Sequence, residues 1–202
     1  MTLGISTTLR NGYLNLIRDA IDAGAAAGKI NFYNETRPAT GGAVTTLLGT
    51  VVCSDPSAPD ASGGVLTLNS MTDDDNADNN GVATWARITD SDDNFVLDAT
   101  VGKSFAQTGT TTNGSAGVTG LTDTSKMDVG MEVSGDGIPD GATIGSIDSS
   151  TQVTLSAAAT ATASSVSLTF KTAGADVLLN DNNISQGGII RVSAGTITEG
   201  NA

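Results

Sequence analysis

The chain has 202 residues, with 22 acidic and 9 basic side chains, no histidine and a formal net charge of −13. Hydrophobic residues make up 38% and aromatic residues 3%, which predicts one or two domains with a thin core of small side chains. A surface this negative repels phosphates and anionic lipid headgroups, so we expect no nucleic-acid or membrane-surface role. The single cysteine, Cys53, excludes an internal disulfide and is predicted to be a buried small hydrophobe.

The N-terminus lacks the basic-then-apolar pattern of a signal peptide. No stretch approaches the ~18 consecutive apolar residues that span a bilayer. We therefore expect the chain to be made and used in a cytoplasm, or in a particle that is assembled there.

The first predicted element is a helix over residues 5–24. Apolar residues at three- and four-residue steps are expected to share one face: Leu9, Tyr13, Leu16, Ile17, Ala20 and Ile21. The other side carries polar residues, namely Arg10, Asn11, Asn15, Arg18 and Asp22. Ser6 or Thr7 is expected to cap the start of the helix, and Gly24 to end it in a left-handed turn. The apolar face is expected either to cover the protein's own sheet or to dock on a neighbouring subunit, with Arg10 and Arg18 contacting an acidic partner surface.

The sequence period changes to two after residue 28 and predicts strands at 29–33, 47–53 and 65–68. Residues 36–42 form a loop that contains Arg37, a proline and two glycines. The strongest strand signal is a hairpin, in which residues 82–88 and 95–99 flank an Asp/Asn turn at 90–94. Trp85 lies in this hairpin, and we predict that it packs in the core.

Composition shifts near Lys103 toward Thr, Ser, Gly and Ala, and residues 103–171 contain no Trp or Tyr. Short alternating runs continue there, at 117–121, 131–134, 143–148, 152–156 and 165–170. This pattern is typical of a small sandwich or barrel. Strand-like runs similar in composition to the first hundred residues return at 175–180, 189–192 and 196–198. We therefore predict a mainly β fold, with a β-sandwich or jelly-roll-like body formed by residues 1–102 plus 172–202, one N-terminal helix, and an inserted small β module at 103–171.

These residues give little support for a catalytic role. Without histidine, a serine nucleophile would need another base, and no Ser-x-x-Lys motif occurs. The acidic loop at 73–80 offers hard-cation ligands but lacks the glycine and the final glutamate of an EF-hand, so we expect a solvated loop and keep a weak Ca²⁺ site as an alternative. We expect no enzyme activity, no cofactor and no metal centre.

Several segments together resemble a family of small tailed-phage proteins that are often encoded among head and tail morphogenesis genes. The matching segments are 9–11, 19–24, 31–34, 36–42, 83–102 and 195–200. The segment 117–156 looks like a separate β module that recurs as an insertion in phage and bacterial surface proteins.

The resemblance implies a virion structural protein assembled in the host cytoplasm, and we expect a capsid cement or decoration protein that stabilises junctions between major capsid subunits. The thin core separately predicts assembly into an oligomer or docking on a larger surface, and we expect a homo-oligomer such as a trimer. A tail or head–tail part is the first alternative, and a glycan- or cation-binding adhesion module the second. The expected contacts with the capsid or another partner are Leu9, Arg10, Tyr13, Leu16, Ile17, Arg18 and Arg37.

Overall fold

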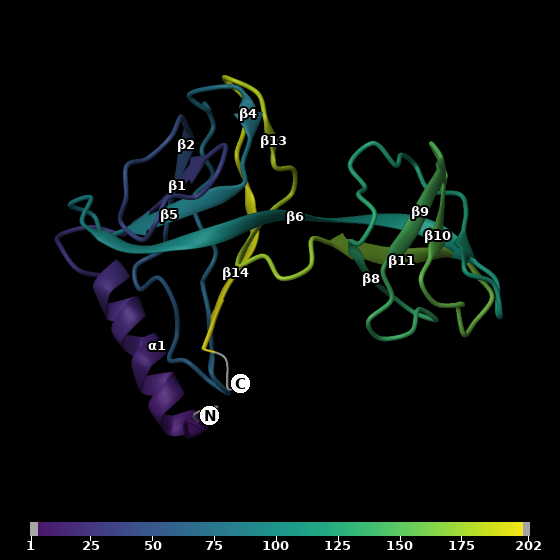
Figure 1. The fold of residues 1–202 in the computed structure, drawn as a ribbon, viewed down its shortest axis with the longest axis horizontal. Coiled ribbons are helices and arrows are strands. Elements are labelled where there is room, and N and C mark those ends of the chain that lie inside the picture. The colour runs from purple at the N-terminus through teal and green to yellow at the C-terminus, as the bar shows by residue number, and fades with distance from the viewer. Residues whose placement is uncertain (1–3, 200–202) are drawn as a thin grey trace. The chain divides into compact units, whose positions relative to one another are not determined.

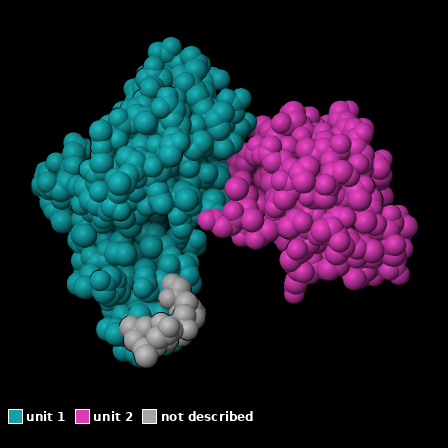
Figure 2. All heavy atoms as spheres, in the orientation of Figure 1, with its two compact units in different colours: residues 1–102, 175–202 teal, residues 103–174 magenta. Residues whose placement is uncertain are grey.

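The computed structural model describes residues 4–199 of the chain (Figure 1). The chain divides into two compact units (Figure 2). Unit 1 comprises residues 1–102 and 175–202, and unit 2 comprises residues 103–174. The insert expected from the sequence ended at residue 171, whereas unit 2 continues to Gly174.

Unit 1 contains the helix α1 and most of the strands. Its elements are α1 (Thr7–Ile21), β1 (Lys29–Tyr33), β2 (Leu47–Val52), β3 (Val65–Thr67), β4 (Gly81–Val82), β5 (Trp85–Thr89), the first half of β6 (Phe95–Thr111), β12 (Val177–Leu179), β13 (Asn183–Ile184) and β14 (Val192–Thr198). Its main sheet has the strand order β2-β1-β5-β6-β12-β14-β3, and β4 pairs with β13 in a separate ladder. The predicted fold class, a mainly β body with one N-terminal helix, is confirmed.

Alternation along β1 suits its position inside the sheet, between β2 and β5. Ile30 and Phe32 are fully buried, while Lys29 and Asn31 are only partly covered. The antiparallel register places Ile30 opposite Ile88 of β5 and Phe32 opposite Ala86. These side chains form the middle of one apolar core, which leucine and isoleucine residues from α1, β2, β3 and β12 complete.

The hairpin predicted around residues 90–94 is present as β5 and β6. Ala86 pairs with Ala99 and Ile88 with Leu97, and the register shifts by one residue next to Thr89. Trp85 is 1% exposed, which confirms that it packs in the core.

Unit 2 is a small barrel. It contains the second half of β6 together with β7 (Gly117–Val118), β8 (Glu132–Ser134), β9 (Ile144–Ser149), β10 (Gln152–Leu155) and β11 (Ala163–Lys171). Two sheets, β6-β11-β8 and β7-β10-β9, are joined along both sides by bridges between Thr110 and Thr119 and between Glu132 and Thr143. Closing the sheet in this way covers strand edges that would otherwise expose unpaired backbone groups.

Two predicted strands differ from the structure. The run predicted at 82–88 is divided into β4 and β5, and residues 83 and 84 belong to neither strand. Residues 189–191 do not form a strand, and β14 begins only at Val192. Instead, Ile190 pairs as a single bridge with Asp74, through two hydrogen bonds between their backbone groups. The run is apolar, as in a strand, and Ile190 is buried. Its partner, however, is the backbone of the acidic loop, where only one residue pairs with it.

Candidate functional site

The helix α1 begins and ends with the expected chemistry but is shorter than predicted. Ser6 caps its start, and its hydroxyl accepts a hydrogen bond from the backbone N–H of Leu9 at 3.3 Å. The helix ends at Ile21, where the N–H of Asp22 reaches the carbonyl of Arg18 at 2.9 Å. Gly24 follows with φ of 96°, a conformation that costs glycine little. The turn at 90–94 packs against this corner.

The polar side of α1 faces the body of unit 1. Three side-chain oxygens accept hydrogen bonds from backbone N–H groups of the segment 57–64. They belong to Asn11 (from Gly64, 2.8 Å), Asn15 (from Ala61, 2.8 Å) and Asp22 (from Ser57, 2.9 Å). This segment runs antiparallel to the helix and has little strand pairing of its own. The amide and carboxylate groups therefore supply the acceptors that its backbone needs.

Two apolar residues of α1 insert into the core beside these hydrogen bonds. Leu14 is 1% exposed and Ile21 is fully buried, and Ile17 packs against the same cluster while partly covered. Leu14 and Ile21 are seven residues apart, which is two helical turns, so they share one face.

The opposite side of α1 carries three large apolar side chains that are mostly exposed. Leu9 is 60% exposed, Tyr13 is 62% exposed and Leu16 is 66% exposed. We call these three residues the α1 strip. Beside it lies a shallow, largely apolar hollow of about 240 Å³, lined by Ile5, Leu9, Arg10, Tyr13 and Glu199. Figure 1 shows α1 at the periphery of unit 1.

The orientation of the helix differs from the sequence-based expectation, which placed Leu9, Tyr13, Leu16 and Ile21 on one face. The helix has two apolar faces. At about 100° per residue, Leu14 lies roughly 140° around the axis from Leu9, and Ile21 follows Leu14. The body takes the face of Leu14 and Ile21 because the neighbouring Asn and Asp side chains can satisfy the backbone of residues 57–64. The α1 strip is left outside.

The two arginines of α1 are engaged within unit 1. Arg10 donates hydrogen bonds to the carbonyl of Glu199 at 3.0 Å and to the hydroxyl of Thr7 at 3.3 Å. Arg18 forms ion pairs with Asp19 and Asp60, and its hydrogen bond to Asp19 raises the pKa of Arg18 above its usual value. These contacts hold the helix in place, so the exposed apolar side chains are the free part of this surface.

Removing one of the helix anchors tests this view of how α1 is held. Asn15→Ala leaves the N–H of Ala61 without its acceptor, and Ala61 is only 8% exposed. We expect unit 1 to lose about 1–3 kcal/mol of unfolding free energy. Urea unfolding followed by the fluorescence of Trp85 measures this, since the chain has one Trp and it lies in unit 1. Asn180→Ala, at an exposed position, is the control and should change stability by less than about 0.5 kcal/mol. Equal effects of the two changes would contradict the anchoring role.

The acidic loop at 73–80 covers the edge of the sheet. The backbone N–H groups of Thr72 and Asp78 donate hydrogen bonds to the carbonyl oxygens of Val52 and Leu48 in β2. A carboxylate oxygen of Asp74 accepts a hydrogen bond from the N–H of Thr50 at 2.9 Å. Asp73 is ion-paired with Arg191 at 2.7 Å. The loop therefore protects the free side of β2 from pairing with other chains. Within residues 4–199, no three His, Cys, Asp or Glu side chains gather closely enough to hold a metal ion.

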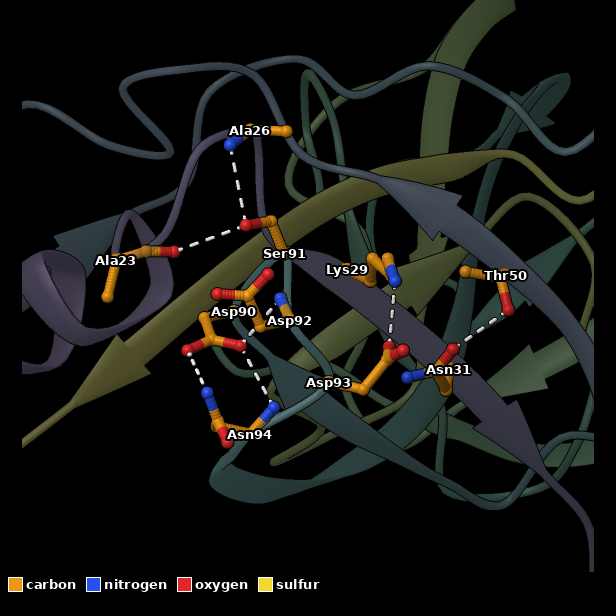
Figure 3. Close-up of polar contacts among 10 residues, drawn as sticks. All are labelled: Ala23, Ala26, Lys29, Asn31, Thr50, Asp90, Ser91, Asp92, Asp93 and Asn94. Atoms are coloured by element: carbon orange, nitrogen blue, oxygen red, sulfur yellow. Dashed lines mark hydrogen bonds and ion pairs between the residues drawn. The ribbon is translucent and has the colours of Figure 1, made fainter.

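The second acidic turn, at 90–94, is held by hydrogen bonds within itself (Figure 3). Asp90 accepts from the backbone N–H groups of Asp92 and Asn94 and from the side-chain amide of Asn94. The amide of Asn94 contributes most to lowering the pKa of Asp90 below its usual value. Figure 3 also shows Ser91 lying between the backbone groups of Ala23 and Ala26. The turn thus fixes the chain that leaves α1.

Arg37 and Cys53 lie in different surroundings. Arg37 is exposed in the loop 36–42, and its guanidinium donates a hydrogen bond to the carbonyl of Asp98 at 3.1 Å. Cys53 is 4% exposed, which confirms the prediction of a buried small hydrophobe, and burial raises the pKa of its thiol to about 11. A thiol with so high a pKa is rarely the nucleophilic thiolate.

Sequence reasoning brought Leu9, Tyr13 and Leu16 together correctly on one face but missed Leu14, which packs in the core. The seven-residue step from Leu14 to Ile21 was a usable signal for a second apolar face. Sequence reasoning also missed a hollow beside the start of β6, lined by residues 37–40 and 95–98. That hollow carried no such signal, because its two walls lie far apart in the chain.

No protein-family model matches the chain, no curated protein is similar to it in sequence, and no solved structure matches its fold. No helix in residues 4–199 is both long and apolar enough to cross a membrane. The fold and the site define a mainly β protein that presents an exposed apolar helix face.

Proposed function

We propose that this chain is a structural protein of a tailed-phage particle, a capsid cement protein that docks on major capsid subunits through the α1 strip. The observation that carries the proposal is the exposure of Leu9, Tyr13 and Leu16 on a helix whose other sides are anchored. The resemblance of residues 9–11, 19–24, 31–34, 36–42, 83–102 and 195–200 to small phage morphogenesis proteins supports the kind of particle.

The size of the α1 strip favours a partner that surrounds it. Three such side chains expose a few hundred Å², about the size of patches that mark interaction sites. A standard stable interface needs roughly 800 Å² from each partner, so the strip alone is too small to hold two flat surfaces together. An apolar helix face can, however, insert into a groove, where it is covered on several sides. The strip therefore fits a groove between capsid subunits.

Charge also favours a different protein as the main partner. Each copy carries a net charge of −13, so bringing copies together is opposed by mutual repulsion. A capsid surface with a basic outer face would instead attract the chain. A trimer around a local three-fold axis remains part of the proposal, and contacts with the capsid would offset the repulsion between its copies.

The proposed mechanism is thermodynamic linkage. A protein that binds only the assembled shell stabilises it, because dissociation of the shell would release the bound copies. At each junction the gain depends on the local concentration relative to the dissociation constant, and a hundredfold excess contributes about 2.7 kcal/mol. Repeated over many symmetry-related junctions, this would resist the internal pressure of packaged DNA.

Replacing the α1 strip tests the docking surface. Leu9→Ser, Tyr13→Ser and Leu16→Ser combined are expected to weaken binding to particles that lack this chain by roughly 100-fold or more. The reason is that full burial of such a side chain is worth about 1.5–3 kcal/mol, that these three are 60–66% exposed and so have about three fifths of this left to gain, and that each 1.4 kcal/mol is tenfold. Co-sedimentation of the purified chain with such particles gives the affinity, and Trp85 fluorescence verifies that unit 1 stays folded.

The matched control removes three exposed apolar side chains outside α1. Val82, Val129 and Ile189 are 48%, 64% and 60% exposed. Their combined replacement by serine should leave particle binding within about twofold of the unchanged chain. Equal losses in both variants, or unchanged binding in the α1 variant, would contradict docking through the strip. The copy number per virion separates cement from a tail part: a number close to that of the major capsid protein supports cement, whereas a single ring contradicts it.

A further inference from the structure

A second surface of unit 1 has the features of a binding site. A hollow of about 320 Å³ lies between residues 37–40 and residues 95–98, at the start of β6. It combines one exposed arginine, Arg37, with apolar side chains, of which Phe95 is 40% exposed. It is separate from the hollow beside the α1 strip, with no lining residue in common.

The walls of this hollow are held rigidly by a buried ion pair. Arg87 contacts both carboxylate oxygens of Asp98, at 2.8 and 3.0 Å, and the two side chains are 12% and 5% exposed. Arg87 also donates to the carbonyl of Gly42 at 3.0 Å, which ties the loop to the strand. A site with fixed walls loses little conformational entropy when a ligand binds.

The same ion pair leaves Arg37 as the charged group of the hollow. The carboxylate of Asp98 is neutralised by Arg87, so Arg37 contacts only its backbone carbonyl. In the part of the chain that the structure describes, Arg37 makes no ion pair. A guanidinium has five N–H donors, and one of them is used here. Arg37 therefore presents an unneutralised cation with spare donors.

The apolar side of the hollow lies next to this cation. The guanidinium of Arg87 lies over the ring of Phe95, with its central carbon 5.1 Å from the ring centroid. Pro38 adds a rigid apolar surface on the loop side. Arginine is enriched among the residues that dominate binding energy at protein interfaces, and aromatic residues including Phe are enriched in the interfaces themselves.

We propose that this hollow binds the side-chain carboxylate of a glutamate or aspartate of a partner protein. A guanidinium recognises a carboxylate through two parallel N–H donors, and the short apolar stem of glutamate would pack against Phe95 and Pro38. Charges are screened beyond about 8 Å at physiological salt, so the local cation decides the contact despite the net charge of −13. A phosphate, with nearly two charges, is usually bound by more than one cation, and Arg37 is the only basic residue among those that line the hollow.

The carboxylate preference can be measured on the free, full-length chain. The probes are N-acetylglutamate α-amide and the matching N-acetylglutamine α-amide, titrated against labelled protein and followed by NMR. The glutamate probe should give saturable shifts of the Arg37 Nε–H and the Phe95 ring, at least about fivefold tighter than the glutamine probe. Equal responses to the two probes, no response at these groups, or equal shifts at all arginines would overturn the proposal.

Two substitutions that each remove one positive charge make the test specific. Arg37→Gln should abolish the response at Phe95. Arg191→Gln removes the same charge at a 57% exposed side chain that is paired with Asp73, outside the hollow, and should leave the response unchanged. Loss of the response in both variants would show a general charge effect and overturn the site.

We take the phage shell as the source of the carboxylate, and this step rests on the proposed function. A separate measurement tests whether the shell is the source. Arg37→Gln should weaken binding to particles lacking the chain by about tenfold relative to Arg191→Gln. If the two arginine variants bind particles equally well while the α1 strip variant binds them weakly, the shell does not supply the carboxylate, and the cement function stands. If the unchanged chain does not bind particles, both the function and this source are overturned, whereas the NMR result decides the site itself.

Discussion

Asp98→Ala should destabilise unit 1 by about 3–5 kcal/mol, because it leaves Arg87 buried without its counter-charge. The Arg87 side chain is only 12% exposed, and its hydrogen bonds to Asp98 are the main cause of its raised pKa. Without the carboxylate, the guanidinium keeps its charge and must be solvated or rearranged. Urea unfolding monitored by Trp85 fluorescence reports on unit 1 alone, since unit 2 has neither Trp nor Tyr.

The double variant Arg87→Met with Asp98→Leu is the control for this effect. Replacing both members of a buried ion pair by apolar side chains of similar size is often neutral or stabilising. The double variant should therefore be more stable than Asp98→Ala by at least about 2 kcal/mol. If the double variant were as unstable as Asp98→Ala, the loss would come from packing and not from the unpaired charge.

Trp85→Ala should lower the unfolding free energy of unit 1 by a similar amount, about 3–5 kcal/mol. The indole is 1% exposed, stacks on Tyr33 with ring centroids 4.4 Å apart, and donates from Nε1 to the carbonyl of Asn34 at 3.0 Å. Its removal leaves a cavity in a core that has few other large side chains to collapse into it. Denaturation followed by circular dichroism measures the change, because the variant lacks the fluorophore.

Two further variants separate packing from the surface contribution. Trp85→Phe keeps an aromatic ring but loses the hydrogen bond to Asn34, and should cost less than Trp85→Ala. Phe95→Ala, at a ring that is 40% exposed, should cost less than about 1.5 kcal/mol. If Trp85→Ala does not fold, Trp85→Phe still tests the prediction, and a neutral result there would contradict a role in the core.

The composition of the core of unit 1 explains why the α1 strip is expected to bind a partner. The core of unit 1 draws on small and β-branched residues, and most of its largest apolar side chains are fully buried. A monomer that leaves Leu9, Tyr13 and Leu16 exposed lacks the stabilisation that their burial would provide. Burial in an assembly would recover that stabilisation, which is why the α1 strip supports a proposal of docking.

Local pattern was enough to predict much of the secondary structure. Residues 29–32 alternate between polar and apolar, residues 29–33 form β1 with the predicted bounds, and the Asp/Asn turn at 90–94 joins β5 to β6 as predicted. Ser6 caps α1 because its hydroxyl reaches an N–H three residues ahead, a contact that depends on neighbouring residues alone. Such features depend on interactions between residues close in the chain, and their sequence signals are therefore direct.

The tertiary structure decided which face of α1 points outward and where a cation stays unpaired. Both apolar faces of the helix were present in the sequence, but the segment 57–64 selected one of them by needing the oxygens of Asn11, Asn15 and Asp22. Arg37, likewise, is one of nine basic residues, and it stays unpaired because Arg87 neutralises Asp98. Each outcome depends on groups that are dozens of residues apart, and their competition for partners is settled only once the chain is folded.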